Sequence, residues 1–164
     1  MALVDWIGQW IVTWPGAVLL QRSGTAYLLV NAAHILGLGL LVGAILPLDL
    51  RLLGLFRGVP LNVVGPFLSR AAAAGLGLAI VTGLWLFTVK PAEYLANEAF
   101  LWKLALLAAA LLNIVVQHLG GAFARATRED GSGGEAGAGV RLVALCSAAL
   151  WLSVLVAGRW IGFV

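Results

Sequence analysis

Charged residues are scarce in this sequence. Only 10% of its 164 residues are Asp, Glu, Lys or Arg, whereas 62% are hydrophobic, and the mean hydropathy is +1.04. A soluble domain covers its apolar core with charged side chains, and about a quarter of its residues are charged. The composition therefore excludes an ordinary soluble domain and predicts a chain surrounded by lipid.

Cysteine and the common catalytic motifs are also lacking. Cys146 is the single cysteine, so the chain has no intrachain disulfide and no cysteine-based zinc cluster. We expect Cys146 to be a small core residue. The sequence has no Gly-rich phosphate loop after a strand, no HExxH and no CxxC. These absences argue against an enzyme and leave electron transfer as the most that the chain would perform.

Four apolar runs predict membrane-spanning helices, because about 20 residues of helix cross the 30 Å hydrocarbon layer. We therefore predict an all-α, integral membrane four-helix bundle that forms a single domain, residues 1–164. A Trp-rich segment at residues 2–14 precedes the bundle and predicts an amphipathic helix in the interface, which Pro15 ends. A polar, Gly-rich loop over residues 120–139 is predicted to be mobile. The four predicted spans cover residues 25–48, 67–89, 99–119 and 140–161.

The basic residues indicate membrane topology and not nucleic-acid binding, although the net charge is +3. They stand singly beside the apolar runs, and Lys and Arg are enriched in cytoplasmic loops. Six of them border the first and third loops, against four on the opposite face. This distribution predicts both termini outside, which in a bacterium would be the periplasmic side of the inner (plasma) membrane. The six are Arg51, Arg57, Arg70, Arg125, Arg128 and Arg141, and the four are Arg22, Lys90, Lys103 and Arg159.

Polar side chains within the spans are the candidate functional residues, because an ionisable group in hydrocarbon needs a partner, an escape to the interface or a function. At 1.5 Å of rise per residue, His34, Lys103 and Arg159 lie roughly 5, 10 and 12 Å to the outer side of mid-membrane. Asn31 shares the helix face of His34. We expect these side chains to converge on a pocket open to the outer face, with Trp102 helping to shape it.

The chemistry of this predicted pocket suits haem b or a quinone. Lys103 and Arg159 would hold propionates or carbonyl oxygens, and His34 would contact the reactive centre of the cofactor. His34 would be a metal ligand only if haem is bound. His118 lies about 12 Å to the inner side, so the two imidazoles differ in depth by roughly 17 Å and do not sandwich one iron.

Each of these residues also has a simpler interpretation. Lys103 and Arg159 are near enough to the interface to snorkel, and His34 is explained equally by a hydrogen bond between neighbouring helices. The outward aromatic residues fit an interfacial belt, with a ring-lined site as the alternative. Asp49 and Arg51 are expected to form a structural ion pair at the cytoplasmic end.

Several segments resemble a family of small, uncharacterised bacterial four-helix membrane proteins. The matching pieces are HILGLGLLVGAILPLDLRLLGL at 34–55, TGLWLF at 82–87, NEAFLWKLALLAAALLN at 97–113 and LWLSVLVAGRWIGF at 150–163. The resemblance implies the architecture and no activity. More distantly, the chain looks like CopD-type proteins and four-helix b-type cytochromes, but it lacks their sets of paired metal or haem ligands, and likeness of fold does not carry function.

Three functions follow as hypotheses. The first is a redox accessory that holds a quinone or a haem near the outer, periplasmic face. The second is a non-catalytic anchor or assembly subunit, with other membrane subunits or a second copy packing on Gly39 and Gly43, which form a GxxxG. The third, a small transporter, is the weakest because no pair of Gly/Pro-broken helices at matching positions marks a midplane site.

Overall fold

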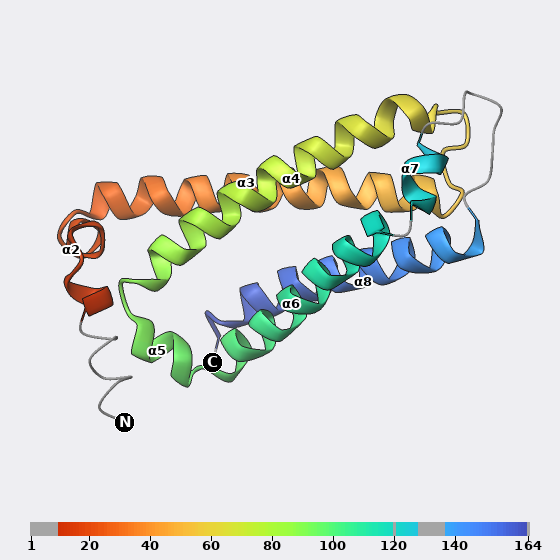
Figure 1. The fold of residues 1–164 in the computed structure, drawn as a ribbon. Helices are drawn as coiled ribbons and strands as arrows, with labels where there is room; N and C mark the ends of the chain where they lie inside the picture. The colour runs from red at the N-terminus through yellow and green to blue at the C-terminus, as the bar shows by residue number, and fades with distance from the viewer. Residues whose placement is uncertain (1–9, 120, 128–136, 164) are drawn as a thin grey trace.

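The structure is a computed structural model that describes residues 10–119, 121–127 and 137–163. These residues form helices and no strand. Four of the helices are long and apolar enough to cross a membrane, and they pack together as a bundle (Figure 1). The predicted all-α four-helix membrane fold is therefore confirmed. The spans are α3 (Gly24–Leu52), α4 (Leu61–Phe87), α6 (Glu98–Leu119) and α8 (Ala138–Trp160).

The helices α3 and α4 are longer than the sequence predicts. Helix α3 continues through Pro47 to Leu52, and α4 begins at Leu61 and contains Pro66. The 29 residues of α3 span about 44 Å, which exceeds the hydrocarbon layer of about 30 Å. The predicted limits were based on hydropathy, which locates only the part of a helix that lies in lipid. The prediction therefore missed the ends of these two helices that extend beyond it.

Short helices connect or flank the spans in the described part of the chain: α2 (Pro15–Arg22), α5 (Pro91–Ala96) and α7 (Ala122–Ala126). Helices α2 and α5 lie at the end of the bundle that also carries the C-terminus, and α7 lies at the opposite end (Figure 1). We call these the α5 end and the α7 end. The predicted loop over 120–139 contains α7 at its start, whereas residue 120 and residues 128–136 lie outside the described part.

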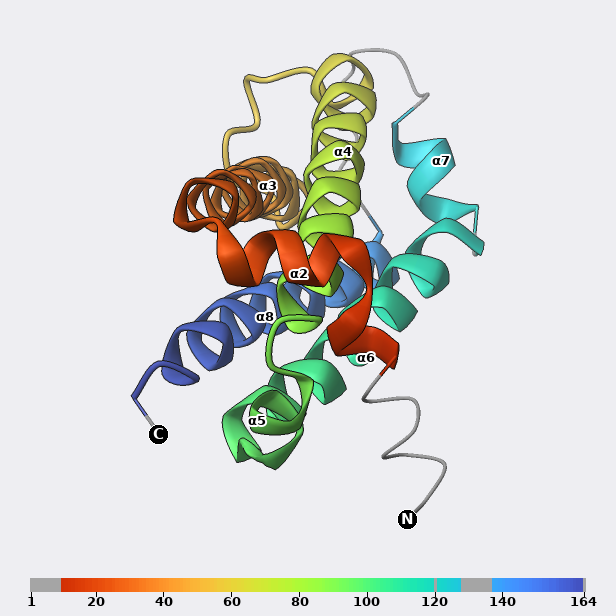
Figure 2. The same cartoon turned by 90° about the vertical axis from the view of Figure 1, so that its left-hand side faces the viewer.

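Helix α2 lies across the α5 end of the bundle (Figure 2). Its Ala17 and Leu20 are buried, and the Trp85 indole N–H donates a 2.9 Å hydrogen bond to the Gly16 carbonyl. Pro15 ends one helical stretch, as predicted, but it also starts α2, because proline suits the first position of a helix. Residues 10–13 are helical, Trp14 forms a bend, and residues 2–9 of the predicted 2–14 helix lie outside the described residues.

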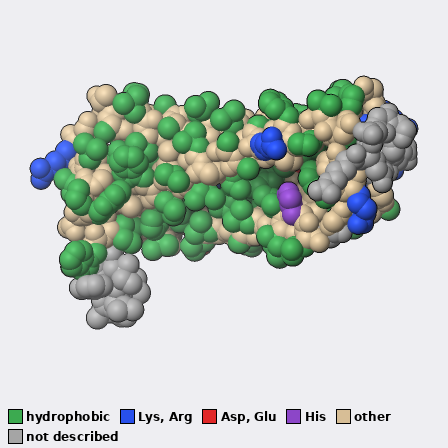
Figure 3. Space-filling view, turned by 45° about the horizontal axis from the view of Figure 1, so that its top comes forward, with side chains coloured by type: hydrophobic (Ala, Val, Ile, Leu, Met, Phe, Trp, Pro, Cys, Tyr) green, Lys and Arg blue, Asp and Glu red, His purple; other side chains and the backbone are tan. Residues whose placement is uncertain are grey.

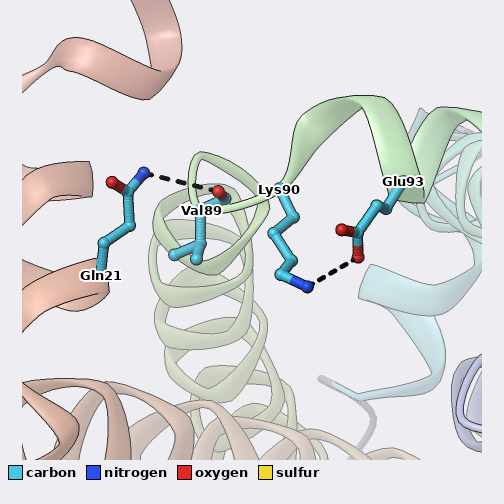
Figure 4. Close-up of polar contacts among 4 residues, drawn as sticks. All are labelled: Gln21, Val89, Lys90 and Glu93. Atoms are coloured by element: carbon cyan, nitrogen blue, oxygen red, sulfur yellow. Dashed lines mark hydrogen bonds and ion pairs between the residues drawn. The ribbon is translucent and has the colours of Figure 1, made fainter.

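Side-chain contacts also join the connecting segments at the α5 end. The Gln21 amide donates to the Val89 carbonyl at 3.5 Å, and the Lys90 ammonium pairs with Glu93 at 3.0 Å (Figure 4). Both residues of the ion pair are exposed, so the pair contributes little stability. The packing of α2 comes mainly from its two buried apolar side chains.

The spans pack as two antiparallel pairs, α3 with α4 and α6 with α8, and α3 also packs on α8. The closest crossing is between Gly37 and Gly75, where a Cβ at Gly75 would lie 2.5 Å from the Leu41 backbone nitrogen. Only glycine permits helices to approach so closely. The buried core includes Leu48 and Leu52 toward the α7 end and extends to Trp151 near the middle of α8.

The outer surface of the bundle is apolar. The view in Figure 3 shows hydrophobic side chains over most of one face, with few charged side chains on it. Cys146 belongs to this exterior, so its predicted core position is wrong. Gly39 and Gly43 are exposed as well, with no atom close to a Cβ built on either.

The expected ion pair between Asp49 and Arg51 is also wrong. Asp49 is fully buried and lies close to the Ser147 side chain of α8. The Arg51 guanidinium instead donates a 2.8 Å hydrogen bond to the Val59 carbonyl in the loop that follows α3. Residues two apart on a helix point in different directions, and here one points into the bundle and the other toward the loop.

Candidate functional site

A cavity of about 240 Å³ lies in the half of the bundle toward the α5 end. Its lining comes from all four spans and from α5. Ile80, Leu84 and Leu104 line the cavity and are also exposed on the surface of the bundle, so the cavity opens sideways between α4 and α6. These two helices are not packed directly on each other as α3 and α4 are. The opening therefore faces the lipid.

His34 and Lys103 are the titratable side chains among the described residues that line this cavity. The remaining lining is almost entirely apolar, with aliphatic side chains along the depth of the cavity and aromatic rings toward the α5 end. Ligand cavities commonly combine an apolar wall with a few polar groups that fix orientation. The aliphatic lining comprises Leu38, Leu41, Leu76, Ala79, Ile80, Leu84, Leu95, Leu104, Leu107 and Val154.

A hydrogen-bond chain holds the His34 ring. The distance from His34 Nδ1 to Thr82 Oγ1 is 3.0 Å, and the Thr82 hydroxyl lies 2.6 Å from the Leu78 carbonyl oxygen, one turn earlier in α4. A carbonyl oxygen only accepts, so the single hydroxyl proton of Thr82 is donated to Leu78. The Thr82 oxygen then accepts from Nδ1–H of His34, which fixes which ring nitrogen carries the proton.

Two glycine contacts bring the residues of this hydrogen-bond chain together. Gly37 lies one turn after His34, and its crossing with Gly75 brings α3 and α4 close enough for the histidine and Thr82 to meet. Gly83 then lies directly against the ring, since a Cβ there would come 3.0 Å from His34 Cε1. The imidazole is thereby confined between its own helix and α4.

Lys103 enters the cavity from α6. It is half-buried, and its side chain passes the Gly158 backbone of α8, where a built Cβ would lie 3.7 Å from Lys103 Cδ and Cε. Within the described part of the chain, no hydrogen bond or ion pair involves its ammonium group. Glu98, the nearest acid in sequence, lines a separate surface depression, and Glu93 is paired with Lys90. The cavity thus has a cationic donor without an anionic partner.

Aromatic rings close the cavity toward the α5 end. Phe87 of α4 and Phe100 of α6 line it and stack with their ring centroids 5.7 Å apart and their planes 7° from parallel. The Tyr94 ring packs beside Phe100, with a centroid distance of 5.3 Å. Burial raises the pKa of the Tyr94 phenol, so this hydroxyl keeps its proton at neutral pH. The cluster separates the cavity from the exposed loop residues.

The structure brings together two of the five residues that the sequence nominated. His34 and Lys103 share the cavity, whereas Asn31 is exposed and is not part of the lining. Trp102 is 67% exposed and lies in a separate surface depression with Trp160 and Glu98.

The remaining candidate, Arg159, lies outside the cavity, with its guanidinium 4.3 Å from the centre of the Phe163 ring. His118 is exposed and bonds to the Ile114 carbonyl at 2.9 Å, away from the cavity. The two histidines of the sequence therefore occupy different environments, as their difference in depth predicts.

Thr82, Gly83 and Trp151 belong to the site but were not nominated from the sequence. Thr82 is a hydroxyl within an apolar run, in the segment TGLWLF, and hydroxyls in membrane helices often bond to neighbouring helices. Trp151 is 1% exposed and forms part of the cavity wall. A polar or large aromatic side chain within an apolar span could have marked these residues as candidates. The sequence does not show which way such a side chain points, because that depends on how the helices pack.

Comparison with known proteins identifies the family of this chain. No curated protein and no solved structure matches it, and neither CopD-type proteins nor b-type cytochromes emerge as relatives. One family model, described as a family of unknown function (DUF6644), matches residues 11–164. That range includes all four spans, the His34 cavity and the segments on which the sequence resemblance was based, and the chain therefore belongs to this family of unknown function.

Proposed function

We propose that this protein is a redox accessory that holds the head group of a lipid-soluble quinone in the His34 cavity. The observation that carries the proposal is the meeting of His34 and Lys103 in an apolar cavity that opens toward lipid. In this proposal the α5 end lies at the outer, periplasmic face of a bacterial inner membrane, which the distribution of Lys and Arg supports. A quinone there would exchange directly with the membrane pool.

The size of the cavity supports a quinone better than a haem. A dry cavity of about 150 Å³ accommodates benzene, and drug-sized ligands occupy about 300–1,000 Å³. At about 240 Å³, the His34 cavity suits one substituted ring whose tail leaves through the side. A haem macrocycle is several times larger than such a ring, so it would require α4 and α6 to move apart.

The lateral opening supports a ligand with an apolar tail. Leu84 and Leu104 stand on opposite sides of the opening and are 64% and 42% exposed. A tail passing between them would remain in contact with hydrocarbon, while the polar oxygens of the ring reach His34 and Lys103. This arrangement directs the polar atoms of the ligand toward the polar groups of the cavity and its apolar tail toward lipid, as a low-polarity environment favours.

Quinone content and the optical spectrum of the purified protein test the proposal. We expect quinone to be extracted from the wild-type protein in amounts close to the amount of protein, without the strong Soret absorbance of haem. His34→Ala should lose most of this quinone. His118→Ala is the matched control, because it removes the other histidine, which is exposed and lies outside the cavity, and should retain it. Equal quinone in all three proteins, or none in the wild type, would refute the proposal.

A second candidate, an anchor or assembly subunit, is favoured by the exposed face of α3. Gly39 and Gly43 have open space around them, so another helix could approach this face closely. Gly39→Leu would then abolish co-purification of a partner subunit or a dimer while leaving quinone content unchanged. Quinone loss with unchanged assembly would instead favour the cavity.

A further inference from the structure

We propose that the cavity binds the reduced, dihydroxy form of the ring in preference to the oxidised, dicarbonyl form. This inference rests on the proposed function and specifies its ligand. It comes from the direction of the hydrogen bonds around His34, and it needs no electron transfer within the protein.

The Thr82 hydroxyl sets the direction of these bonds. Its 2.6 Å contact with the Leu78 carbonyl uses its proton, because two oxygens at this distance repel each other unless a proton lies between them. His34 Nδ1 therefore carries a proton and donates it to Thr82 across 3.0 Å. In a neutral imidazole the other nitrogen, Nε2, is then an acceptor.

The charge of Lys103 favours the neutral imidazole. Both residues line the same apolar cavity, and the described lining contains no acidic side chain. A protonated His34 would add a second unpaired positive charge in low-polarity surroundings, which is costly. Among the described residues, the side-chain hydrogen bond of the ring runs from Nδ1 to Thr82, and the backbone of Ala79 also lies close to the ring. With its proton on Nδ1, the neutral ring has its lone pair on Nε2. This nitrogen is therefore available to a ligand as an acceptor.

The cavity thus offers one acceptor, His34 Nε2, and one donor, the Lys103 ammonium. A hydroquinone hydroxyl donates and accepts, so its ring oxygens can satisfy both groups. A quinone carbonyl only accepts, so it can bond to Lys103 but leaves Nε2 facing a second lone pair. An unsatisfied polar group in an apolar site typically reduces affinity by a factor of about 10 or more.

Equilibrium binding of a decyl-substituted benzohydroquinone and the matching benzoquinone, under anaerobic conditions in lipid nanodiscs, tests this inference. We expect the wild-type protein, freed of native quinone, to bind the hydroquinone about tenfold more tightly or better. Thr82→Val removes the acceptor for Nδ1–H and frees the ring to present either nitrogen as a donor. Its preference should fall toward equal binding, mainly through tighter binding of the quinone. Thr82→Ser keeps the hydroxyl and should keep the preference.

The outcomes separate this inference from the proposed function. If neither form binds the wild-type protein, both the proposed function and the inference fail. If the quinone binds as tightly as the hydroquinone, or more tightly, the proposed function survives and the inference is overturned. If the preference is present but unchanged in a folded Thr82→Val protein, the hydrogen-bond chain is not its source, and the inference is likewise overturned.

Discussion

The two halves of this bundle differ in how their space is filled. Toward the α7 end, Leu48 and Leu52 belong to a continuous buried core, and Trp151 lies where this core meets the cavity. Toward the α5 end, α4 and α6 leave a cavity of about 240 Å³ with two titratable groups in its wall. A tightly packed half that supports a hollow half is the usual arrangement of a binding site on a rigid scaffold. Stability and binding should therefore respond to substitutions in different halves.

Forcing apart the close helix crossing should have the largest effect. Gly75→Leu would place side-chain atoms where the Leu41 nitrogen and the Gly37 carbonyl oxygen lie within 2.8 Å of a built Cβ. Backbone atoms cannot yield as flexible side chains do, so we expect the protein to lose several kcal/mol or fail to fold. Thermal unfolding in detergent measures this effect. Gly39→Leu on the open face of α3 is the control, and an equal loss there would contradict the role of the crossing.

Removing core volume from the packed half should have the next largest effect on stability. Leu48 is 1% exposed, and Leu→Ala at such a site costs about 2–5 kcal/mol. Leu84, on the rim of the cavity, is 64% exposed, and Leu84→Ala should lower stability by less than about 1 kcal/mol. A comparison of unfolding midpoints tests the contrast, which fails if both substitutions cost the same.

Filling the hollow half should abolish binding without destabilising the protein. Leu104→Trp would occupy the cavity from the α6 side, and we expect quinone retention to fall at least tenfold at an unchanged melting temperature. Leu101→Trp is the control, because Leu101 is similarly exposed on the same helix but does not line the cavity. Retained quinone in Leu104→Trp would place the ligand elsewhere.

A single methyl group beside His34 should have the smallest of these effects. In Gly83→Ala the new Cβ would lie 3.0 Å from the His34 ring, so the ring must shift by a few tenths of an ångström. We expect weaker hydroquinone binding, by about three- to tenfold, with a change in stability below about 1 kcal/mol. Binding isotherms and melting curves together check this, and unaltered affinity would mean that the ring is not held as tightly as described.

The sequence was sufficient to predict the fold, because four apolar runs long enough to span a membrane, with few charged residues, leave few alternatives to a helix bundle in lipid. It also indicated His34 and Lys103 as candidates, because an ionisable side chain in hydrocarbon is energetically costly. It did not separate them from Asn31, Trp102 and Arg159, because depth along a helix says little about which neighbour a side chain faces. The bond between His34 and Thr82 depends on the Gly37 and Gly75 crossing, a tertiary contact that periodicity alone does not specify.

Photo-crosslinking with an azido-substituted quinone tests the central claim most directly, because it reports where the ring binds. The account predicts that labelled peptides come from the cavity walls, within residues 76–87 of α4 and 100–107 of α6, and that unlabelled quinone competes with the labelling. Labelling concentrated at the surface depression of Trp102 and Trp160, or spread along the lipid-facing surface without competition, would contradict it.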